Sequence, residues 1–472
     1  MAAAIVTVAL LTFIPPATAA LWLDVAIGRM IWTGDGIPRT VLFPFTEASQ
    51  LPFHAHAWLS SLVLYFLQDL LGHENLIFAK GLLGLALFGL CWRLSYRLCG
   101  SLFASVLVSL AAMAAANYRF FLRPELFALF FTVIVLGLLV EFRAGGRWRN
   151  LLVCVPIALV WANSHGSFPI ALVIAAAFAA GAAIEAFGAT KSNRLRVSTR
   201  AAFPYLICAA LMALAMLFNP YGAHVFEYAL NFHHWVPTLH GSFVGSRGFW
   251  AFMLLLAFSA VVLSHGRRNV PAVGWLLLIA FGCLALLAQR QIVFFAMVSV
   301  YPLSTALRGV ASRLEALPLA RSAALAFLVA CVGLVIGYGN LYGGYPYHVA
   351  SDDFSLLLVE FLDKPQLRGN VLNSHVLGSE LIYRCYPRLR PAIDSRVDVY
   401  GEKYFRELNR LNTDEDALKA FVARYHVDYV LLLRREFDLG IRNMPHIRDD
   451  GWRIMFGDGK VVLLGRPNRP RR

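Results

Sequence analysis

Long uncharged apolar stretches restrict the fold of this sequence more than any other feature. Residues 102–116 (LFASVLVSLAAMAAA) and 126–140 (LFALFFTVIVLGLLV) contain no charged side chain. With a few flanking residues, each is long enough to cross about 30 Å of hydrocarbon as a helix. Of all 472 residues, 59% are hydrophobic and only 15% are charged, whereas soluble domains carry roughly a quarter charged residues. The sequence therefore predicts a polytopic membrane protein surrounded by membrane lipids.

The net charge is +14, and many of the arginines cluster in five loops between the apolar stretches. These loops are residues 93–97, 142–149, 191–200, 265–269 and 308–313. Cytoplasmic loops hold an excess of Lys and Arg, so we expect all five on the cytoplasmic side. Membrane topology thus explains the charge, and we expect no nucleic-acid partner.

Eleven transmembrane helices fit between these loops, with the N-terminus in the cytoplasm. They are expected at residues 2–19, 76–96, 101–117, 124–142, 150–164, 167–187, 202–218, 247–265, 271–288, 291–307 and 321–339. The first segment ends in the small residues ATAA, as a cleaved signal peptide does, but it lacks a basic start. We therefore expect an uncleaved span, and the alternative of cleavage stays open.

The expected spans divide the chain into an all-α membrane domain, residues 1–344, and an exported α/β domain, residues 345–472. The first external loop, residues 20–75, belongs to the membrane domain in this division and holds helical stretches at 21–32 and 57–72. If the second stretch crossed the membrane, every later basic loop would change sides. We therefore expect a helix that lies along the outer interface or dips into it.

In the exported domain, strand-like runs alternate with helical ones. Strands are expected at residues 369–374, 390–395 and 427–433, a helix at 413–426 and a hairpin at 452–466. Asp-Gly marks the hairpin turn, and Thr413 and Asp416 have the spacing of a capping box. This alternation predicts helices packed on a sheet. On a strand, Asp394, Arg396 and Asp398 would share one face, where a structural ion network is favoured over contact with a glycan.

Polar and ionisable residues gather in the turns that this topology places outside. They are Arg119, Arg123, Glu125, Asn163, His165, Asn219, Tyr221 and Arg290, together with Asp24, His54 and His56 of the first loop. Ionisable groups at membrane depth are costly and tend to mark functional sites. Each also has an ordinary explanation: interfacial arginines, a helix start at Pro124 and Glu125, and turns around His165 and Asn219. The gathering of all these residues on the external side is stronger evidence for a functional site than any one of them.

Six short motifs, spread over most of the chain, resemble those of the polytopic C-type glycosyltransferase (GT-C) fold. They are residues 27–40, 56–59, 122–127, 161–168, 219–222 and 391–401. Within that fold, the sequence resembles in particular bacterial membrane glycosyltransferases of the mannosyl- and aminoarabinosyl-transferase type. This resemblance implies a protein of the bacterial inner membrane that uses a polyprenyl-phosphate-linked sugar. Transfer would occur at the outer leaflet to a lipid, glycan or protein hydroxyl.

The resemblance also implies an acidic base in the first external loop. The usual position of that acid falls near Ala19 or Ala20, which lack a carboxylate, and Asp24 lies one helical turn from Ala20. Asp24 is therefore the candidate base that deprotonates the acceptor hydroxyl. Cations stabilise the departing lipid phosphate in such a reaction, and a guanidinium can bind two of its oxygens. The candidate phosphate ligands are Arg119, Arg123 and Arg290.

Several members of the family hold a divalent metal, and His54 and His56 are the candidate ligands here. The carboxylate that often follows the second histidine is replaced by Ala57, although imidazoles alone suit a borderline metal. The missing acid at Ala19 and Ala20 leaves two alternatives open. One is a catalytically silent scaffold that partners another glycan-assembly protein. The other is a transporter or flippase for a lipid-linked glycan, which predicts paired halves with broken helices.

Overall fold

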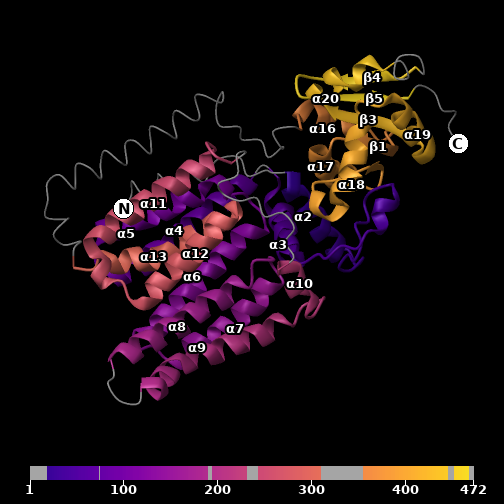
Figure 1. The fold of residues 1–472 in the computed structure, drawn as a ribbon. Coiled ribbons are helices and arrows are strands. Elements are labelled where there is room, and N and C mark those ends of the chain that lie inside the picture. Colours follow the sequence, from indigo (N-terminus) through magenta and orange to yellow (C-terminus); the bar gives the residue numbers. More distant parts are fainter. Residues whose placement is uncertain are drawn as a thin grey trace. The chain divides into compact units, whose positions relative to one another are not determined.

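The computed structural model describes residues 19–73, 75–189, 194–230, 243–309, 354–444 and 451–466. The chain divides into two compact units (Figure 1). The helical unit contains the described residues from Asn75 to Gly309, and the mixed unit contains residues 19–73 and the described residues from Phe354 onward.

The helical unit is built from apolar helices that follow one another along the chain. They are α4 (Leu76–Cys99), α5 (Leu102–Ala116), α6 (Pro124–Arg143), α7 (Trp148–Ala162), α8 (Ile170–Ala189), α9 (Arg194–Met216), α10 (His224–Leu230), α11 (Arg247–Gly266), α12 (Ala272–Leu287) and α13 (Ile292–Ala306). All 15 residues of α13 are buried, because it packs against α4, α5, α6, α11 and α12. A helix that is apolar on every side suits such a central position.

The prediction of a multi-pass membrane protein is supported, but the count of eleven spans is not confirmed. Nine expected spans coincide with helices, α4 to α9 and α11 to α13. The segments expected at 2–19 and 321–339 lie outside the described residues, except for Ala19. Among the described residues, six helices are long and apolar enough to cross a membrane, and α7 and α12 are shorter apolar helices.

The mixed unit contains a five-stranded sheet with the strand order β2-β1-β3-β5-β4. The strands are β1 (Gly369–Asn373), β2 (Leu389–Pro391), β3 (Val427–Leu433), β4 (Arg453–Gly457) and β5 (Val461–Gly465). Strand β1 runs parallel to β2 and β3, while β5 runs antiparallel to β3 and β4. The predicted hairpin is β4–β5, and the predicted strands at 369 and 427 are β1 and β3.

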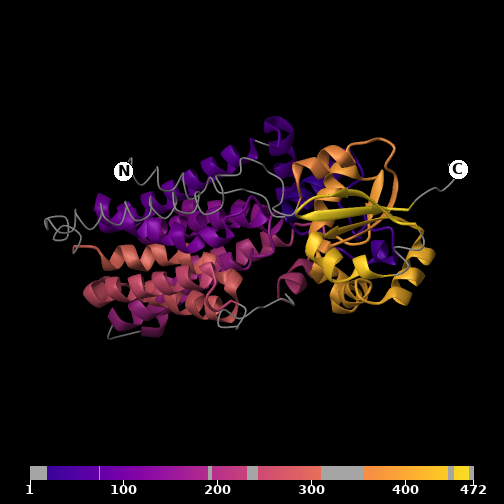
Figure 2. The ribbon, with the colours of Figure 1, turned by 90° about the horizontal axis from the view of Figure 1, so that it is seen from above.

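Helices cover both faces of this sheet (Figures 1 and 2). They are α16 (Leu356–Leu362), α17 (His375–Cys385), α18 (Val397–Arg410), α19 (Glu415–Tyr425) and α20 (Arg434–Leu439). Successive residues of a strand point to opposite faces. Leu431 and Leu463 therefore enter the core with α16 and α17, while Leu432 and Leu464 enter the core with α18, α19 and α20. The predicted α/β domain is confirmed.

Two local predictions in this domain are wrong. Asp414, not Thr413, caps α19, because its side chain accepts a hydrogen bond from the backbone N–H of Ala417 at 3.0 Å. Residues 394–398 do not continue a strand: β2 ends at Pro391, and Arg396 is the N-cap residue of α18. One further bond to β1 follows Pro391, from the Ala392 backbone N–H to the Val371 carbonyl oxygen at 3.0 Å, and α18 then begins at Val397.

The first loop belongs to the same compact unit as the C-terminal domain, although the sequence division placed it with the spans. Between α2 (Ala19–Trp32) and α3 (Trp58–Leu71) lies a loop with one 3₁₀ turn, Glu47–Gln50. Val41 and Ala48 of this loop are buried in the core beneath α18 and α19. The backbone N–H of Phe45 donates to the carbonyl oxygen of Pro391 at 3.1 Å. Apolar burial and backbone pairing thus hold the loop on the sheet domain.

Candidate functional site

An ion pair between a half-buried arginine and a buried glutamate lies at the turn between α5 and α6 of the helical unit. Arg119 Nε donates to Glu125 Oε1 and Oε2 at 3.0 and 3.1 Å, and its Nη2 donates to Oε2 at 2.7 Å. Glu125 is 7% exposed. Pro124 begins α6 as predicted, and Glu125 lies in its first turn, where the helix dipole favours negative charge. Because a buried charge must be paired, each partner fixes the other.

Arg123 and His165 are also brought to this carboxylate. Arg123 is the N-cap residue of α6, and both Arg123 and His165 lie within electrostatic range of Glu125. The backbone N–H of Ser167 donates to His165 Nδ1 at 3.2 Å. A neutral imidazole that accepts at Nδ1 carries its proton on Nε2. His165 therefore has the turn role expected of it and also lies beside the ion pair.

Tyr118 joins this turn to the segment that carries Arg290. Its hydroxyl donates to the carbonyl oxygen of Gln289, which begins the 3₁₀ turn Gln289–Gln291. The charge of Arg290 acts on the Tyr118 hydroxyl. On α11, a Cβ added at Gly248 would lie 2.7 Å from the Tyr118 ring, so only a glycine allows this close packing. The three candidate arginines thus lie around one pair of turns.

Lys80 is a further cation in this neighbourhood that the sequence analysis missed. It lies in α4, is 2% exposed and has its Nζ 6.0 Å from the centroid of the Phe120 ring. Phe120 directly follows Arg119. The available signal was a single charged residue in the otherwise apolar residues 76–92. An ionisable side chain inside a membrane segment is a functional-site candidate by default.

Asn163 and Asn219 make structural hydrogen bonds at neighbouring turns. Asn163 Nδ2 donates to the carbonyl oxygen of Phe218 at 3.0 Å and so joins the end of α7 to the end of α9. Asn219 Oδ1 accepts from the backbone N–H of Tyr221 at 2.8 Å, which is the side-chain turn that Asn commonly forms. The expected turn at 219–222 is present, and a site-lining role for these residues stays a prediction.

The remaining predicted residues belong to the mixed unit. Asp24 is half-buried on α2, and Ser61 Oγ of α3 donates to its Oδ1 at 3.4 Å. His54 is exposed, and the half-buried His56 has its Nδ1 3.2 Å from the His54 carbonyl oxygen. These two histidines form a local turn just before α3 begins at Trp58.

The described residues do not build a metal centre around these histidines. Among them, no three His, Cys, Asp or Glu side chains gather closely enough to hold a metal ion. His54 and His56 alone do not fit a divalent metal, whose protein sites usually draw on three or more ligands. We therefore derive no reaction step through a metal, and the predicted metal site remains a prediction.

The fold is shared with membrane glycosyltransferases of known structure. The sequence matches no family model and no curated protein. The Archaeoglobus fulgidus oligosaccharyltransferase in complex with Zn and sulfate superposes with a TM-score of 0.60 at 13% identity, over 91% of this chain and 68% of that chain. The archaeal oligosaccharyltransferase AglB from Archaeoglobus fulgidus, in complex with an inhibitory peptide and a dolichol-phosphate, superposes with a TM-score of 0.58 at 11% identity, over 92% of this chain and 69% of that chain.

A second protein matches over almost its whole length. ArnT from Cupriavidus metallidurans, bound to undecaprenyl phosphate, superposes with a TM-score of 0.55 at 13% identity, over 98% of this chain and 97% of that chain. Identities this low establish the fold alone. The chain therefore has the GT-C fold of polytopic membrane glycosyltransferases, as its sequence motifs predicted.

Proposed function

We propose that this chain is an integral membrane glycosyltransferase of the bacterial inner membrane. It transfers a sugar from a polyprenyl-phosphate donor to a hydroxyl of a lipid, glycan or protein acceptor at the outer leaflet. One observation carries the proposal: cationic side chains gather at adjoining turns in a fold shared with proteins solved with undecaprenyl phosphate and dolichol-phosphate.

The cations are suited to a lipid phosphate that leaves with increased negative charge. When the bond between the sugar and the phosphate breaks, its electron pair goes to the phosphate oxygen. Fixed positive groups stabilise that product-like charge more than they stabilise the donor. Arg119 uses Nε and Nη2 on Glu125, so its main role is to hold the turn. Direct phosphate contact then falls mainly to Arg123, Arg290 and Lys80.

Asp24 is the proposed base. The acceptor oxygen attacks the anomeric carbon, and Asp24 takes the hydroxyl proton as the bond to phosphate breaks. The bond from Ser61 Oγ to Asp24 Oδ1 orients the carboxylate. The competing proposal, a silent scaffold that partners a glycan-assembly protein, is favoured by Ala19 and Ala20, which begin α2 without a carboxylate.

A transfer assay separates these proposals. The purified protein is incubated with a panel of radiolabelled polyprenyl-phosphate sugars and membrane acceptors, and wild type is compared with Asp24→Asn. Asp35→Asn is the matched control, because Asp35 is an exposed residue in the turn that follows α2. We expect transfer by wild type and the control and little by Asp24→Asn. No transfer or donor hydrolysis across the panel would contradict the enzyme, whereas an active Asp24→Asn would exclude only Asp24.

A further inference from the structure

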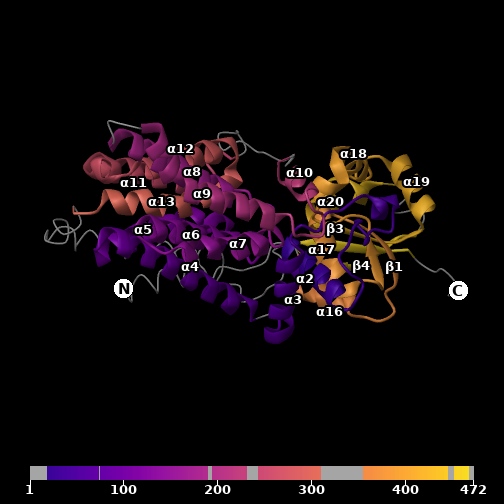
Figure 3. The same cartoon turned by 90° about the horizontal axis from the view of Figure 1, so that it is seen from below.

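Helix α2, which carries Asp24, packs directly on α17 of the C-terminal domain (Figure 3). The Trp22 ring stacks on the Tyr383 ring with centroids 4.6 Å apart and an interplanar angle of 24°. Trp22 is fully buried. Offset stacking of large rings contributes about 0.5–1.5 kcal/mol beyond the burial of their area. This stack is therefore a strong point of attachment between two segments far apart in the sequence.

Charged groups reinforce the stack at both of its ends. The Arg384 guanidinium lies 5.5 Å from the centroid of the Trp22 ring, and Arg384 Nε donates to Glu380 Oε1 at 2.9 Å. Glu380 is fully buried, so this ion pair holds Arg384 in place. Two turns further along α2, Arg29 Nη2 donates to the carbonyl oxygen of Tyr383 at 3.2 Å. Residues seven apart lie on the same helix face, so α2 is held along its length.

The opposite face of α2 is held by α3. Gly28 lies one turn after Asp24 on the same face, and a Cβ added at Gly28 would overlap the Ser61 carbonyl group. Only glycine permits this close approach of the two backbones. The same Ser61 donates its hydroxyl hydrogen bond to Asp24. Helix α2 therefore lies between α17 on one side and α3 on the other, and Asp24 faces α3.

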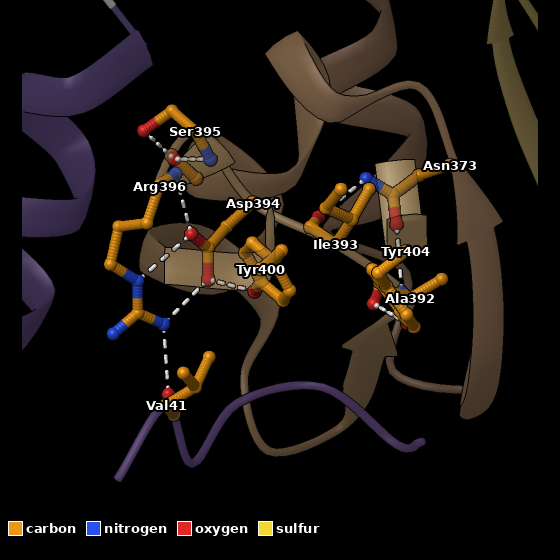
Figure 4. A network of polar contacts seen from close by, with 10 residues as sticks. Val41, Asn373, Ala392, Ile393, Asp394, Ser395, Arg396, Tyr400 and Tyr404 are labelled. Carbon is orange, nitrogen blue, oxygen red and sulfur yellow. Dashed lines mark hydrogen bonds and ion pairs between the residues drawn. The ribbon is translucent and has the colours of Figure 1, made fainter. Parts of the chain in front are cut away.

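The loop that links α2 to α3 is also fixed by the C-terminal domain (Figure 4). Arg396 Nη2 donates to the Val41 carbonyl oxygen at 2.8 Å and to Asp394 Oδ2 at 2.6 Å. The Tyr400 hydroxyl donates to the same carboxylate oxygen at 2.7 Å. The Arg396 guanidinium lies 4.4 Å from the centroid of the Phe53 ring. These contacts are buried, so the loop has little freedom to move α2 or α3.

We propose that Tyr383 and Arg384 are positioning residues for sugar transfer, a claim that rests on the proposed function with Asp24 as its base. They touch neither donor nor acceptor in this scheme. They act by holding α2 so that the Asp24 carboxylate keeps a fixed place beside Ser61. The C-terminal domain is then part of the machinery that orients the base. A misplacement of about 1 Å at a catalytic group can cost about 100-fold in rate.

The test compares Tyr383→Leu with Tyr429→Leu in the full-length protein in lipid nanodiscs. Tyr429 is a partly buried tyrosine of the same domain, on β3, that packs in the core with α16 and α17. Hydrogen exchange of residues 19–32 reports the attachment of α2, and the donor titration of the transfer rate gives kcat and KM. We expect faster exchange in α2 and a kcat lowered about 10- to 100-fold in Tyr383→Leu, with KM for the donor little changed. Tyr383→Phe keeps the ring stack and should have the wild-type exchange rate in α2 and the wild-type kcat. Tyr429→Leu should resemble wild type in both quantities.

Arg29→Met is the second variant, because it removes an attachment of α2 without altering the core of the C-terminal domain. It should raise exchange in α2 and lower kcat in the same direction as Tyr383→Leu, by a smaller factor. The positioning role is overturned if exchange in α2 rises while kcat stays at the wild-type value, or if Tyr429→Leu lowers kcat equally. Wild type that transfers no sugar would instead contradict the proposed function itself, which keeps the two failures distinct.

Discussion

Neutralising Asp394 tests how the C-terminal domain holds the first loop. The side chain is fully buried, and its carboxylate accepts from Arg396 Nε at 2.9 Å, from Arg396 Nη2 at 2.6 Å, from the Arg396 backbone N–H at 3.0 Å and from the Tyr400 hydroxyl at 2.7 Å. Burial alone would lower the pKa of Arg396, but the charge and hydrogen bonds of Asp394, together with Tyr400, more than offset this and raise the pKa above its ordinary value. Asp394→Asn therefore leaves a buried guanidinium without its counter-ion. Breaking such a pair costs about 3–5 kcal/mol.

Native-state hydrogen exchange of the full-length protein measures that cost locally. Each 1.4 kcal/mol is a tenfold change in an opening equilibrium, so exchange at residues 40–53 of the first loop should accelerate by about 10²- to 10³-fold or more. Glu402→Gln is the matched control, since it removes an exposed partner of Arg406 on α18 and should leave exchange unchanged. An acceleration below tenfold in Asp394→Asn would refute the conclusion that this charge pair fixes Arg396 on the loop.

Three further predictions follow from single contacts. Gly28→Ala should separate α2 from α3, which costs about 1–3 kcal/mol of stability and raises hydrogen exchange in α3. The control Gly89→Ala should leave exchange in α3 unchanged, because its added Cβ would meet nothing within 4 Å. Lys80→Met should weaken binding of undecaprenyl phosphate by about 10- to 100-fold, as expected for a lost charge-assisted hydrogen bond, and Lys80→Arg should retain most of it, measured by native mass spectrometry. The Tyr425 hydroxyl and the Arg424 guanidinium hold the pKa of Glu47 below its ordinary value of 4.5. The stabilisation from Glu47 is thus complete above pH 4.5 and is lost as the pH falls through its lowered pKa. As the pH falls through that range, hydrogen exchange at residues 40–53 should rise in wild type relative to Glu47→Gln.

The sequence was sufficient to predict elements whose signal is local. Pro124 followed by Glu125 marked the start of α6, and the apolar run 427–433 became the central strand β3, buried on both faces. Apolar runs likewise located nine helices of the helical unit. These signals depend on periodicity and on the chemistry of helix starts, which act over a few residues.

Contacts between distant segments could not be predicted in the same way. The bond from Arg396 to Val41 spans 355 positions of the chain, and no local pattern indicates such a pairing. The run 390–395 predicted a strand that would align Asp394, Arg396 and Asp398 on one face, but β2 ends at Pro391 and tertiary contacts fix the segment differently. The sequence pattern did not indicate a site at Lys80, because a single charged residue does not interrupt an apolar span. Its place next to Phe120 depends on how α4 packs on α5.

The most direct measurement of the proposed activity is the release of free polyprenyl phosphate from a sugar-linked donor. Mass spectrometry of the lipids would follow this product in nanodiscs that contain the protein, the donor and membrane acceptors. Wild type should release one polyprenyl phosphate for each sugar transferred, and combined substitution of Arg123 and Arg290 by Met should abolish release while the fold persists. A donor that stays intact with wild type under every acceptor condition, although it binds the protein, would contradict a glycosyltransferase and favour the silent scaffold.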